Sequence, residues 1–506
     1  MFSQIRHAVF WPSLIALLLA LALSVYDKLL FLNVVQLINE SILNHFSWLF
    51  STATILLVLM SLVIFISPLG KIRIGGDKAV PILNRWRWFS IVLCTTIATG
   101  ILFWGMAEPI FHYISPPESL DIEPKSEAAA IFSMSTMYLH WSFTPYAIYV
   151  LPSLLFALAF FNKGSDYSIS ATLFPLFGRN PRGLLSKSLD AVALFSLVAG
   201  MAASLGGGLL TLAGGINLIF GTETNFILLA CICFAVVAIF LISAVSGLLK
   251  GVKILSDWNL RVFILLLLIF VIFIPLKEVL ELNFSGLKLY ISDFIDKSTF
   301  IGAESGDDWP KKWTVFNWAN WMAWAPVTAL FLGNLGYGRT IREFILFTWI
   351  FPALFAIVWM SVFSGSALVY ENLSIIDLSM KLQESGPESI VYSVIEHFPG
   401  GDFISILFFL AVFISFVTAA DSTTIAMGAL STSGLTPKNP EPPTGIKIIW
   451  GILVGIMALI MVAYAGIEGI KMISTIGGLP IAFYMIAICI SAFIYYIKML
   501  KKRDSF

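Results

Sequence analysis

The sequence predicts an all-α polytopic membrane protein with about twelve transmembrane helices. Of its 506 residues, 58% are hydrophobic and only 12% are charged, and the mean hydropathy is +0.92. A soluble domain carries about twice that share of charged residues. Apolar segments of about 20 residues, the length that crosses a bilayer, are centred near residues 17, 58, 97, 148, 202, 235, 267, 326, 355, 416, 456 and 485.

Basic residues gather in every second loop between these segments, and this pattern orients the chain. Arg73 and Arg85 lie in the second loop, Arg339 and Arg342 lie in the eighth, and the third loop carries acids such as Glu118. The positive-inside rule then places both termini in the cytoplasm of a cell with the chain in its cytoplasmic (inner) membrane. The first apolar run lacks a small-residue cleavage site and many spans follow it, so we expect a retained helix.

The composition also excludes several classes of protein. The formal net charge is 0, so no basic surface for nucleic acid is expected. The cysteines Cys94, Cys231, Cys233 and Cys489 all fall inside apolar runs, which argues against a disulfide framework or a zinc site.

The third span, residues 90–113, is interrupted by Gly100 and Gly105 and carries Glu108 near its outer end. A helix that loosens at glycines frees backbone carbonyls, which a membrane tolerates only where they line a cavity. Freed carbonyls can coordinate a cation. Close helix packing through small residues is the alternative interpretation.

The fourth span holds His140, Trp141, Tyr146 and Tyr149, with Pro145 interrupting the regular turn. We expect an aromatic cluster at membrane depth here, and we assign His140 no proton coupling. The tenth span contains Asp421 among hydroxyl side chains, including Thr418. An intramembrane acid is a candidate functional group, and helix bridging by the acid and the hydroxyls is the alternative.

The eighth span, within residues 313–343, carries three tryptophans at a spacing of three, Trp318, Trp321 and Trp324. On a helix this spacing places them on one slowly drifting face. Indole prefers the membrane interface, so tryptophans at mid-span favour an internal aromatic box that binds a desolvated organic cation by cation–π contacts. Helix–helix packing is the alternative, and the second aromatic cluster on the fourth span favours the box.

These stretches resemble the betaine/carnitine/choline transporter (BCCT) family over roughly residues 10–500. The fragments that carry the resemblance are FWGMAEP (103–109), HWSFTPYAIY (140–149), the tryptophan stretch running into GRTIREF (338–344), and FVTAADS (416–422). The resemblance implies a LeuT-type fold, with two peripheral helices followed by two inverted repeats of five helices. The implied division is 1–86 for the tail and peripheral helices, 87–283 for spans 3–7, 284–312 for an amphipathic connector, 313–500 for spans 8–12, and 501–506 for a short tail.

The resemblance also implies a function, a secondary active transporter that works by symport or antiport and moves a trimethylammonium or related zwitterionic solute by alternating access. The implied substrate-binding residues are Trp141, Tyr146, Tyr149, Trp318, Trp321, Trp324 and Tyr113. Choline specialists of the family resemble one another in an acid at the position of Gly100, so we rank zwitterions such as betaine and carnitine above choline.

Sodium is the candidate coupling ion, and we expect no other cofactor. The family's sodium site would fall on the backbone carbonyls of Cys94, Ile97 and Ser415 and on the hydroxyl of Thr418. A second hydroxyl of the sodium symporters falls on Ala419, which has none. Arg261 is either a positive-inside anchor or a fixed charge that replaces sodium, as an arginine does in the sodium-independent exchanger of the family. We favour sodium-independent transport slightly.

Two other classes of protein compete with a transporter. A polytopic membrane enzyme usually shows dense His/Asp/Glu clusters, whereas the five histidines here are scattered along the chain. A channel needs an open pore, which the aromatic centre argues against. The resemblance further suggests a homotrimer with residues 285–298 at the contact. It also suggests weak osmotic activation, since the chain ends shortly after Lys502.

Overall fold

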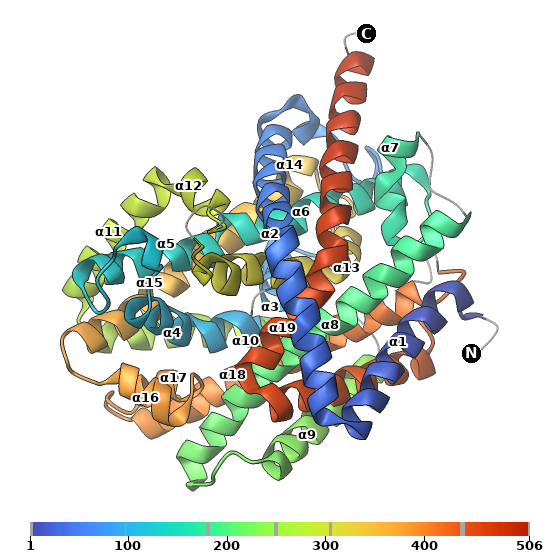
Figure 1. Cartoon of the computed structure of the whole chain (residues 1–506). Coiled ribbons are helices and arrows are strands. Elements are labelled where there is room, and N and C mark those ends of the chain that lie inside the picture. The colour runs from blue at the N-terminus through green and yellow to red at the C-terminus, as the bar shows by residue number, and fades with distance from the viewer. Residues whose placement is uncertain are drawn as a thin grey trace.

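The chain folds into a bundle of helices in the computed structural model, which describes residues 4–96, 98–178, 183–246, 251–302, 306–435 and 441–503 (Figure 1). These residues form two isolated β-bridges and no strand. The all-α prediction is therefore confirmed.

The first half of the chain contains α1 (His7–Tyr26), α2 (Lys28–Ile66), α3 (Arg85–Thr96), α4 (Ala98–Ile114), α5 (Glu127–Trp141), α6 (Phe143–Ala157), α7 (Phe174–Phe177), α8 (Gly183–Phe220), α9 (Phe226–Ser246) and α10 (Gly251–Phe273). The second half contains α11 (Leu276–Ser292), α12 (Phe294–Thr299), α13 (Phe316–Leu335), α14 (Ile341–Ile345), α15 (Phe351–Asn372), α16 (Leu378–Ser385), α17 (Ser389–Ile395), α18 (Gly401–Leu430) and α19 (Thr444–Arg503).

The number of membrane spans agrees with the expected twelve. Nine helices of the described chain are long and apolar enough to cross a bilayer, and α3 with α4 forms a tenth, bent by 53°. The 60 residues of α19 are two helices merged across Gly466, whose backbone is non-helical, and α13 adds a tryptophan-rich helix of 20 residues. The third span is therefore broken between α3 and α4, before Gly100. The expected interruption at Gly105 was wrong, because Gly105 lies inside α4.

Four contacts near the ends of the spans join segments that the sequence predicts to lie on the same side of the membrane. Arg6 pairs with Asp190 at 2.5 Å, and Arg85 pairs with Glu343 at 2.9 Å. These residues come from the N-terminal segment and from loops predicted to be cytoplasmic. The Ser119 hydroxyl donates to Asp307 at 2.8 Å. Similarly, Lys125 pairs with Glu371 at 3.4 Å.

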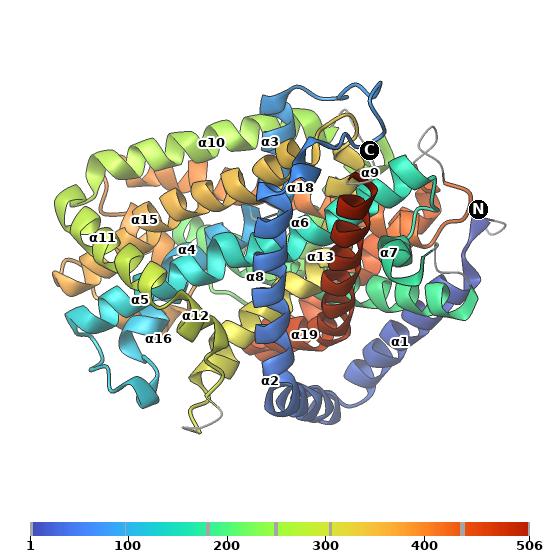
Figure 2. The same cartoon turned by 90° about the horizontal axis from the view of Figure 1, so that it is seen from above.

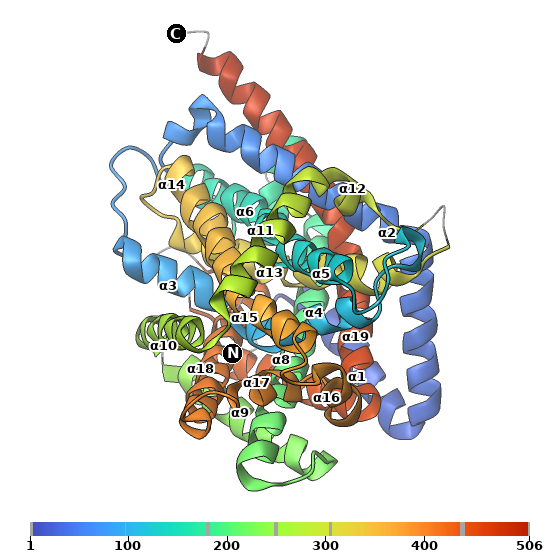
Figure 3. The same ribbon diagram turned by 90° about the vertical axis from the view of Figure 1, so that its left-hand side faces the viewer.

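Helix α13 is the centre around which the other helices pack. It contacts α6, α8 and α19 and lies in the interior of the ribbon view in Figure 3. Its residues from Phe316 to Gly333 are buried with the exception of Asn320. Glycines allow this close approach, since a Cβ at Gly333 would lie 2.6 Å from the ring of Phe156 and 2.7 Å from the carbonyl oxygen of Ser153. By contrast, α10 and α11 run along one edge of the bundle (Figure 2).

The helix contacts fit two interlocked repeats. Both α3 and α4 contact α18, and α13 contacts α8. If spans 3–7 and 8–12 are repeats, both contacts join the first helix of one repeat to the third helix of the other. The exact division at residues 283 and 313 stays a prediction; α11 already begins at Leu276, ahead of the expected connector.

Candidate functional site

Four aromatic rings from three helices meet around Trp321 of α13. The ring centre of Trp321 lies 5.8 Å from Trp141, 5.6 Å from Tyr146 and 5.0 Å from Tyr149. All four side chains are almost completely buried. We call this set, Trp141, Tyr146, Tyr149 and Trp321, the aromatic box.

A local break in the fourth span places three of these rings. Helix α5 ends at Trp141, Ser142 has non-helical backbone angles, and α6 begins at Phe143. Pro145 then sits in the first turn of α6, where a missing N–H removes no helical hydrogen bond. Trp141 therefore reaches the box from the end of one helix, and Tyr146 and Tyr149 reach it from the start of the next.

The box forms one wall of a small cavity at the bend between α3 and α4. Its volume is about 40 Å³, and it is lined by Thr95, Thr96, Gly100, Trp141, Tyr149, Ser204, Asn320, Trp321 and Trp324. That volume holds a few water molecules at most, so this conformation is contracted around the box. Asn320 is fixed there, since its side-chain oxygen accepts a hydrogen bond from the Ser474 hydroxyl at 3.0 Å.

Two other aromatic residues expected at the site lie apart from the box. Trp318 is fully buried, with its ring centre 5.7 Å from that of His140. Tyr113 lies thirteen residues beyond Gly100 on α4, about 20 Å along the helix. Its hydroxyl donates to the Lys125 carbonyl at 2.9 Å. The structure thus does not bring Tyr113 to the box in this conformation.

A buried polar cluster adjoins the box, and the sequence analysis missed it. The carboxylate of Glu108 accepts a hydrogen bond from the indole nitrogen of Trp141 at 2.8 Å, through Oε2. Its other oxygen, Oε1, lies 2.6 Å from Nδ1 of His140, 3.3 Å from Nε2 of His112 and 3.4 Å from the Asn317 amide nitrogen. The view that the histidines are scattered was therefore wrong for two of them. The one available signal was the spacing of four between Glu108 and His112, which places both on one helix face.

The expected sodium ligands lie at the junction of α3, α10 and α18. Asn259 of α10, which the sequence analysis did not single out, is completely buried there. Its amide nitrogen donates to the Ser415 hydroxyl at 2.8 Å and lies 3.8 Å from the Cys94 sulfur. The Thr418 hydroxyl donates to the Ile414 carbonyl at 2.8 Å. Ile97 lies outside the described residues.

Arg261 and Asp421 are not brought to this junction as partners. Arg261 is exposed, with its guanidinium 5.3 Å from the ring centre of Trp258. Asp257, four residues before Arg261, pairs with Arg87 at 3.7 Å. Asp421 accepts a hydrogen bond from Ser243 at 2.6 Å and so bridges α18 to α9.

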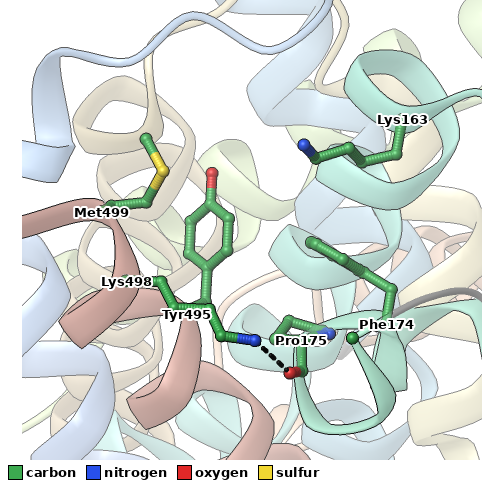
Figure 4. A pocket seen from close by; sticks show the side chains of 7 residues that line it. Lys163, Phe174, Pro175, Tyr495, Lys498 and Met499 are labelled. Atoms are coloured by element: carbon green, nitrogen blue, oxygen red, sulfur yellow. Dashed lines mark hydrogen bonds between the residues drawn. The ribbon is translucent and has the colours of Figure 1, made fainter. Parts of the chain in front are cut away.

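Two of the larger pockets in the described part of the chain are lined partly by lysine. One, of about 380 Å³, lies between α7 and the end of α19 and is lined by Lys163, Phe174, Pro175, Gly178, Tyr495, Lys498 and Met499 (Figure 4). Its Lys498 ammonium donates to the Pro175 carbonyl at 3.1 Å (Figure 4). The other, of about 250 Å³, lies between α5, α12 and Trp309.

Lys297 inserts its ammonium group into the second of these pockets. The nitrogen donates to the Thr136 hydroxyl at 3.1 Å and lies 4.1 Å from the ring centre of Phe132. Burial of the charge lowers the pKa of Lys297 to about 7, and the nearby Asp293 partly opposes that shift. This lysine belongs to α12, outside the membrane-spanning helices.

The chain is similar to a family of transporters along almost its whole length. The family model described as "BCCT, betaine/carnitine/choline family transporter" matches residues 8–502. The glycine betaine transporter OpuD of Bacillus subtilis is 29% identical over 97% of this chain and 94% of that protein. Glycine betaine transporter 1 of Vibrio parahaemolyticus is 31% identical, over 89% and 86%. An ectoine/hydroxyectoine transporter of Virgibacillus pantothenticus is 29% identical, over 91% and 89%.

Among solved structures, a Na⁺-coupled sialic acid symporter in its substrate-bound outward-open state aligns with 87% of this chain and 86% of its own. The TM-score is 0.46 and the identity is 15%. A likeness at that level does not establish a shared fold or a shared ion.

Proposed function

The chain belongs to the betaine/carnitine/choline transporter family, and from that premise we propose that it carries a small zwitterion whose quaternary ammonium group is held in the aromatic box. Its family and its relatives are transporters, and the protein is therefore a transporter and not an enzyme. The proposal concerns the solute, the residues that bind it and the coupling ion.

The meeting of four buried rings around Trp321 is the observation that supports this proposal. A desolvated cation gains about 2 kcal/mol from a well-placed aromatic ring. Several rings together therefore give useful affinity for an ion that keeps its charge and cannot donate hydrogen bonds. A quaternary ammonium group has both properties, and relatives named for glycine betaine transport fit this class, since glycine betaine carries such a group.

Gly100 favours a zwitterion over choline. A Cβ at this position would lie 2.6 Å from the Trp141 ring, so an acidic side chain has no room beside the ring in this conformation. Without an acid here, the cavity has no carboxylate facing a substrate that carries only a positive charge. Choline uptake by the same fold remains the alternative that the solute screen below separates.

The first test is uptake of radiolabelled glycine betaine into proteoliposomes by Trp321→Ala and Trp141→Ala. We expect each variant to lose most uptake while it still folds, because each loses one wall of the box. Trp258→Ala, which removes an exposed tryptophan outside the box, is the matched control. Full uptake by both box variants would eliminate the box. Competition by unlabelled carnitine, ectoine and choline ranks the solutes.

Substrate counterflow in sealed vesicles separates a carrier from a channel. A carrier accelerates uptake of labelled solute when the vesicle is loaded with unlabelled solute, and a channel does not. Chemical analysis of the recovered solute also excludes conversion by an enzyme.

We further propose that transport does not require sodium. Ala419 lacks the second hydroxyl, and the Thr418 hydroxyl is already hydrogen-bonded within the protein. The Asn259 amide nitrogen enters the junction from α10 and donates to the Ser415 hydroxyl, which links α10 to α18 without an ion. Asn259 therefore takes the place of Arg261 as the side chain that we expect to hold α10 against α18 at this junction when no ion is bound.

Uptake with potassium in place of sodium tests this proposal. We expect uptake to persist, Asn259→Ala to impair it, and Arg261→Ala to leave it unchanged because Arg261 is exposed. If uptake vanishes without sodium, the proposal is wrong and another oxygen completes the site. The proposed topology places both termini in the cytoplasm, and a homotrimer through residues 285–298 is the expected assembly.

A further inference from the structure

The strongest unassigned feature is the contact between Glu108 and the aromatic box. Both side chains of the Glu108–Trp141 pair are buried, and the indole nitrogen lies 2.8 Å from Oε2. An indole N–H can only donate, so Oε2 acts as the acceptor. Trp141 is therefore fixed at its nitrogen by a group that does not itself line the cavity.

The remaining contacts of Glu108 show why the carboxylate stays in place. Its Oε1 faces His140 at 2.6 Å, and the far nitrogen of His140 lies 3.0 Å from the Thr314 hydroxyl. The Asn317 amide, which comes from α13, also reaches Oε1. Helices α4, α5 and α13 thus share one carboxylate, and a buried carboxylate is tolerable only with such partners.

Trp141 is held on its other sides as well. Its six-membered ring lies against the backbone at Gly100, where even a methyl group would approach to 2.6 Å. Its ring centre lies 5.8 Å from Trp321 in an edge-on arrangement. The hydrogen bond to Glu108 therefore selects one orientation of a ring that has almost no free space.

The same bond affects how strongly the ring attracts a cation. Cation–π attraction is electrostatic and depends on the negative potential of the ring face. An ionised acceptor on the N–H makes a stronger hydrogen bond than a neutral acceptor and increases electron density on the indole.

We propose that Glu108 is the positioning residue of the aromatic box. Glu108 holds the Trp141 ring in one orientation and makes the π face of that ring more attractive to a quaternary ammonium group. This inference rests on the proposed function, because it concerns the affinity of the box for its cation. Glu108 acts through Trp141 and touches no substrate. Its effect must therefore depend on the indole N–H.

A metal ion is the competing explanation for the cluster. Glu108, His112 and His140 offer ligand atoms within 4.8 Å of one another. Ligands of a tetrahedral zinc ion lie about 3.3 Å apart, given bonds of about 2.0–2.1 Å. The 2.6 Å separation of Glu108 from His140 is shorter than this, and it is the length of a hydrogen bond.

The test is a double-mutant cycle read by calorimetric titration of glycine betaine into the purified protein. We expect Glu108→Gln to weaken the Kd about tenfold, the size of a partial loss of one desolvated cation–π contact. Trp141→Phe keeps a ring but lacks the N–H, so we expect adding Glu108→Gln to it to cause no further loss. Glu371→Gln, which alters a buried glutamate far along α15, should leave the Kd unchanged.

The outcomes separate the two proposals. Wild-type protein that binds no quaternary ammonium zwitterion refutes the proposed function. A wild-type Kd in Glu108→Gln, or an equal tenfold loss in the Trp141→Phe background, refutes the role of Glu108 alone. Loss of wild-type binding in EDTA, restored by zinc, would assign the cluster to a metal instead. If Glu108→Gln does not fold, Glu108→Asp replaces it in the test. Aspartate keeps the negative charge, but its shorter side chain moves the carboxylate away from the Trp141 nitrogen. We expect the same tenfold weakening of the Kd.

Discussion

Gly100→Ala tests the geometry of the aromatic box with the smallest change that the chain allows. The added Cβ would lie 2.6 Å from Cζ3 and 2.8 Å from Cη2 of Trp141. Carbon atoms in ordinary contact lie about 3.5–4.0 Å apart. The Trp141 ring must therefore move by about 1 Å, or α4 must move away from it.

Either movement costs free energy, and that cost determines the expected loss of affinity. Trp141 is tied to Glu108 at its nitrogen and packs against Trp321. Overpacking of a buried site costs about 1–3 kcal/mol, and each 1.4 kcal/mol is a factor of about ten in affinity. If that cost falls on the box, the Kd for glycine betaine weakens about ten- to a hundredfold.

Calorimetric titration measures the Kd, and thermal unfolding confirms that the variant folds. Gly207→Ala is the matched control, because a Cβ there would meet its nearest atom, in the Phe103 ring, at an ordinary 3.7 Å. Both changes replace glycine by alanine inside a helix, which by itself favours the helix. Wild-type affinity in Gly100→Ala, or an equal loss in Gly207→Ala, would refute the reasoning.

Two further predictions concern stability. The pKa of Lys297 is lowered to about 7 in the folded protein, against 10.5 for an ordinary lysine. Between these two pH values the unfolded chain binds more protons than the folded protein. The stability of the folded protein therefore rises with pH across that window. Lys297→Met should therefore show a smaller rise in Tm between pH 7 and 10 than the wild type. Lys277→Met changes an exposed lysine and should show the same rise in Tm as the wild type. An equal rise in Tm with pH in all three proteins would contradict the prediction. Arg6→Met leaves the buried Asp190 carboxylate without its ion partner, and breaking such a pair costs about 3–5 kcal/mol. We therefore expect a clearly lower Tm in Arg6→Met than in Arg85→Met, which breaks a pair whose arginine is 73% exposed. A Tm as low in Arg85→Met as in Arg6→Met would count against this account.

The composition and the motifs were enough to predict the membrane class, the spans and the family. Long apolar segments are a local property, because a bilayer demands about 20 apolar residues from each helix separately. The tryptophan spacing and the resemblance together indicated the members of the box. The structure brings Trp141, Tyr146, Tyr149 and Trp321 together, although their role in binding stays a proposal.

The tertiary structure alone decided which polar groups meet. Glu108, His140 and Asn317 lie on three helices, and nothing in the periodicity of each helix shows that their side chains meet in one buried cluster. The same holds at the sodium junction, where Asn259 and Arg261 are two residues apart on α10. A helix turns by about 100° per residue, so two residues face opposite sides, and packing buries Asn259 while it leaves Arg261 exposed. Sequence patterns report the faces of single helices, whereas contacts between helices depend on how all of them pack at once.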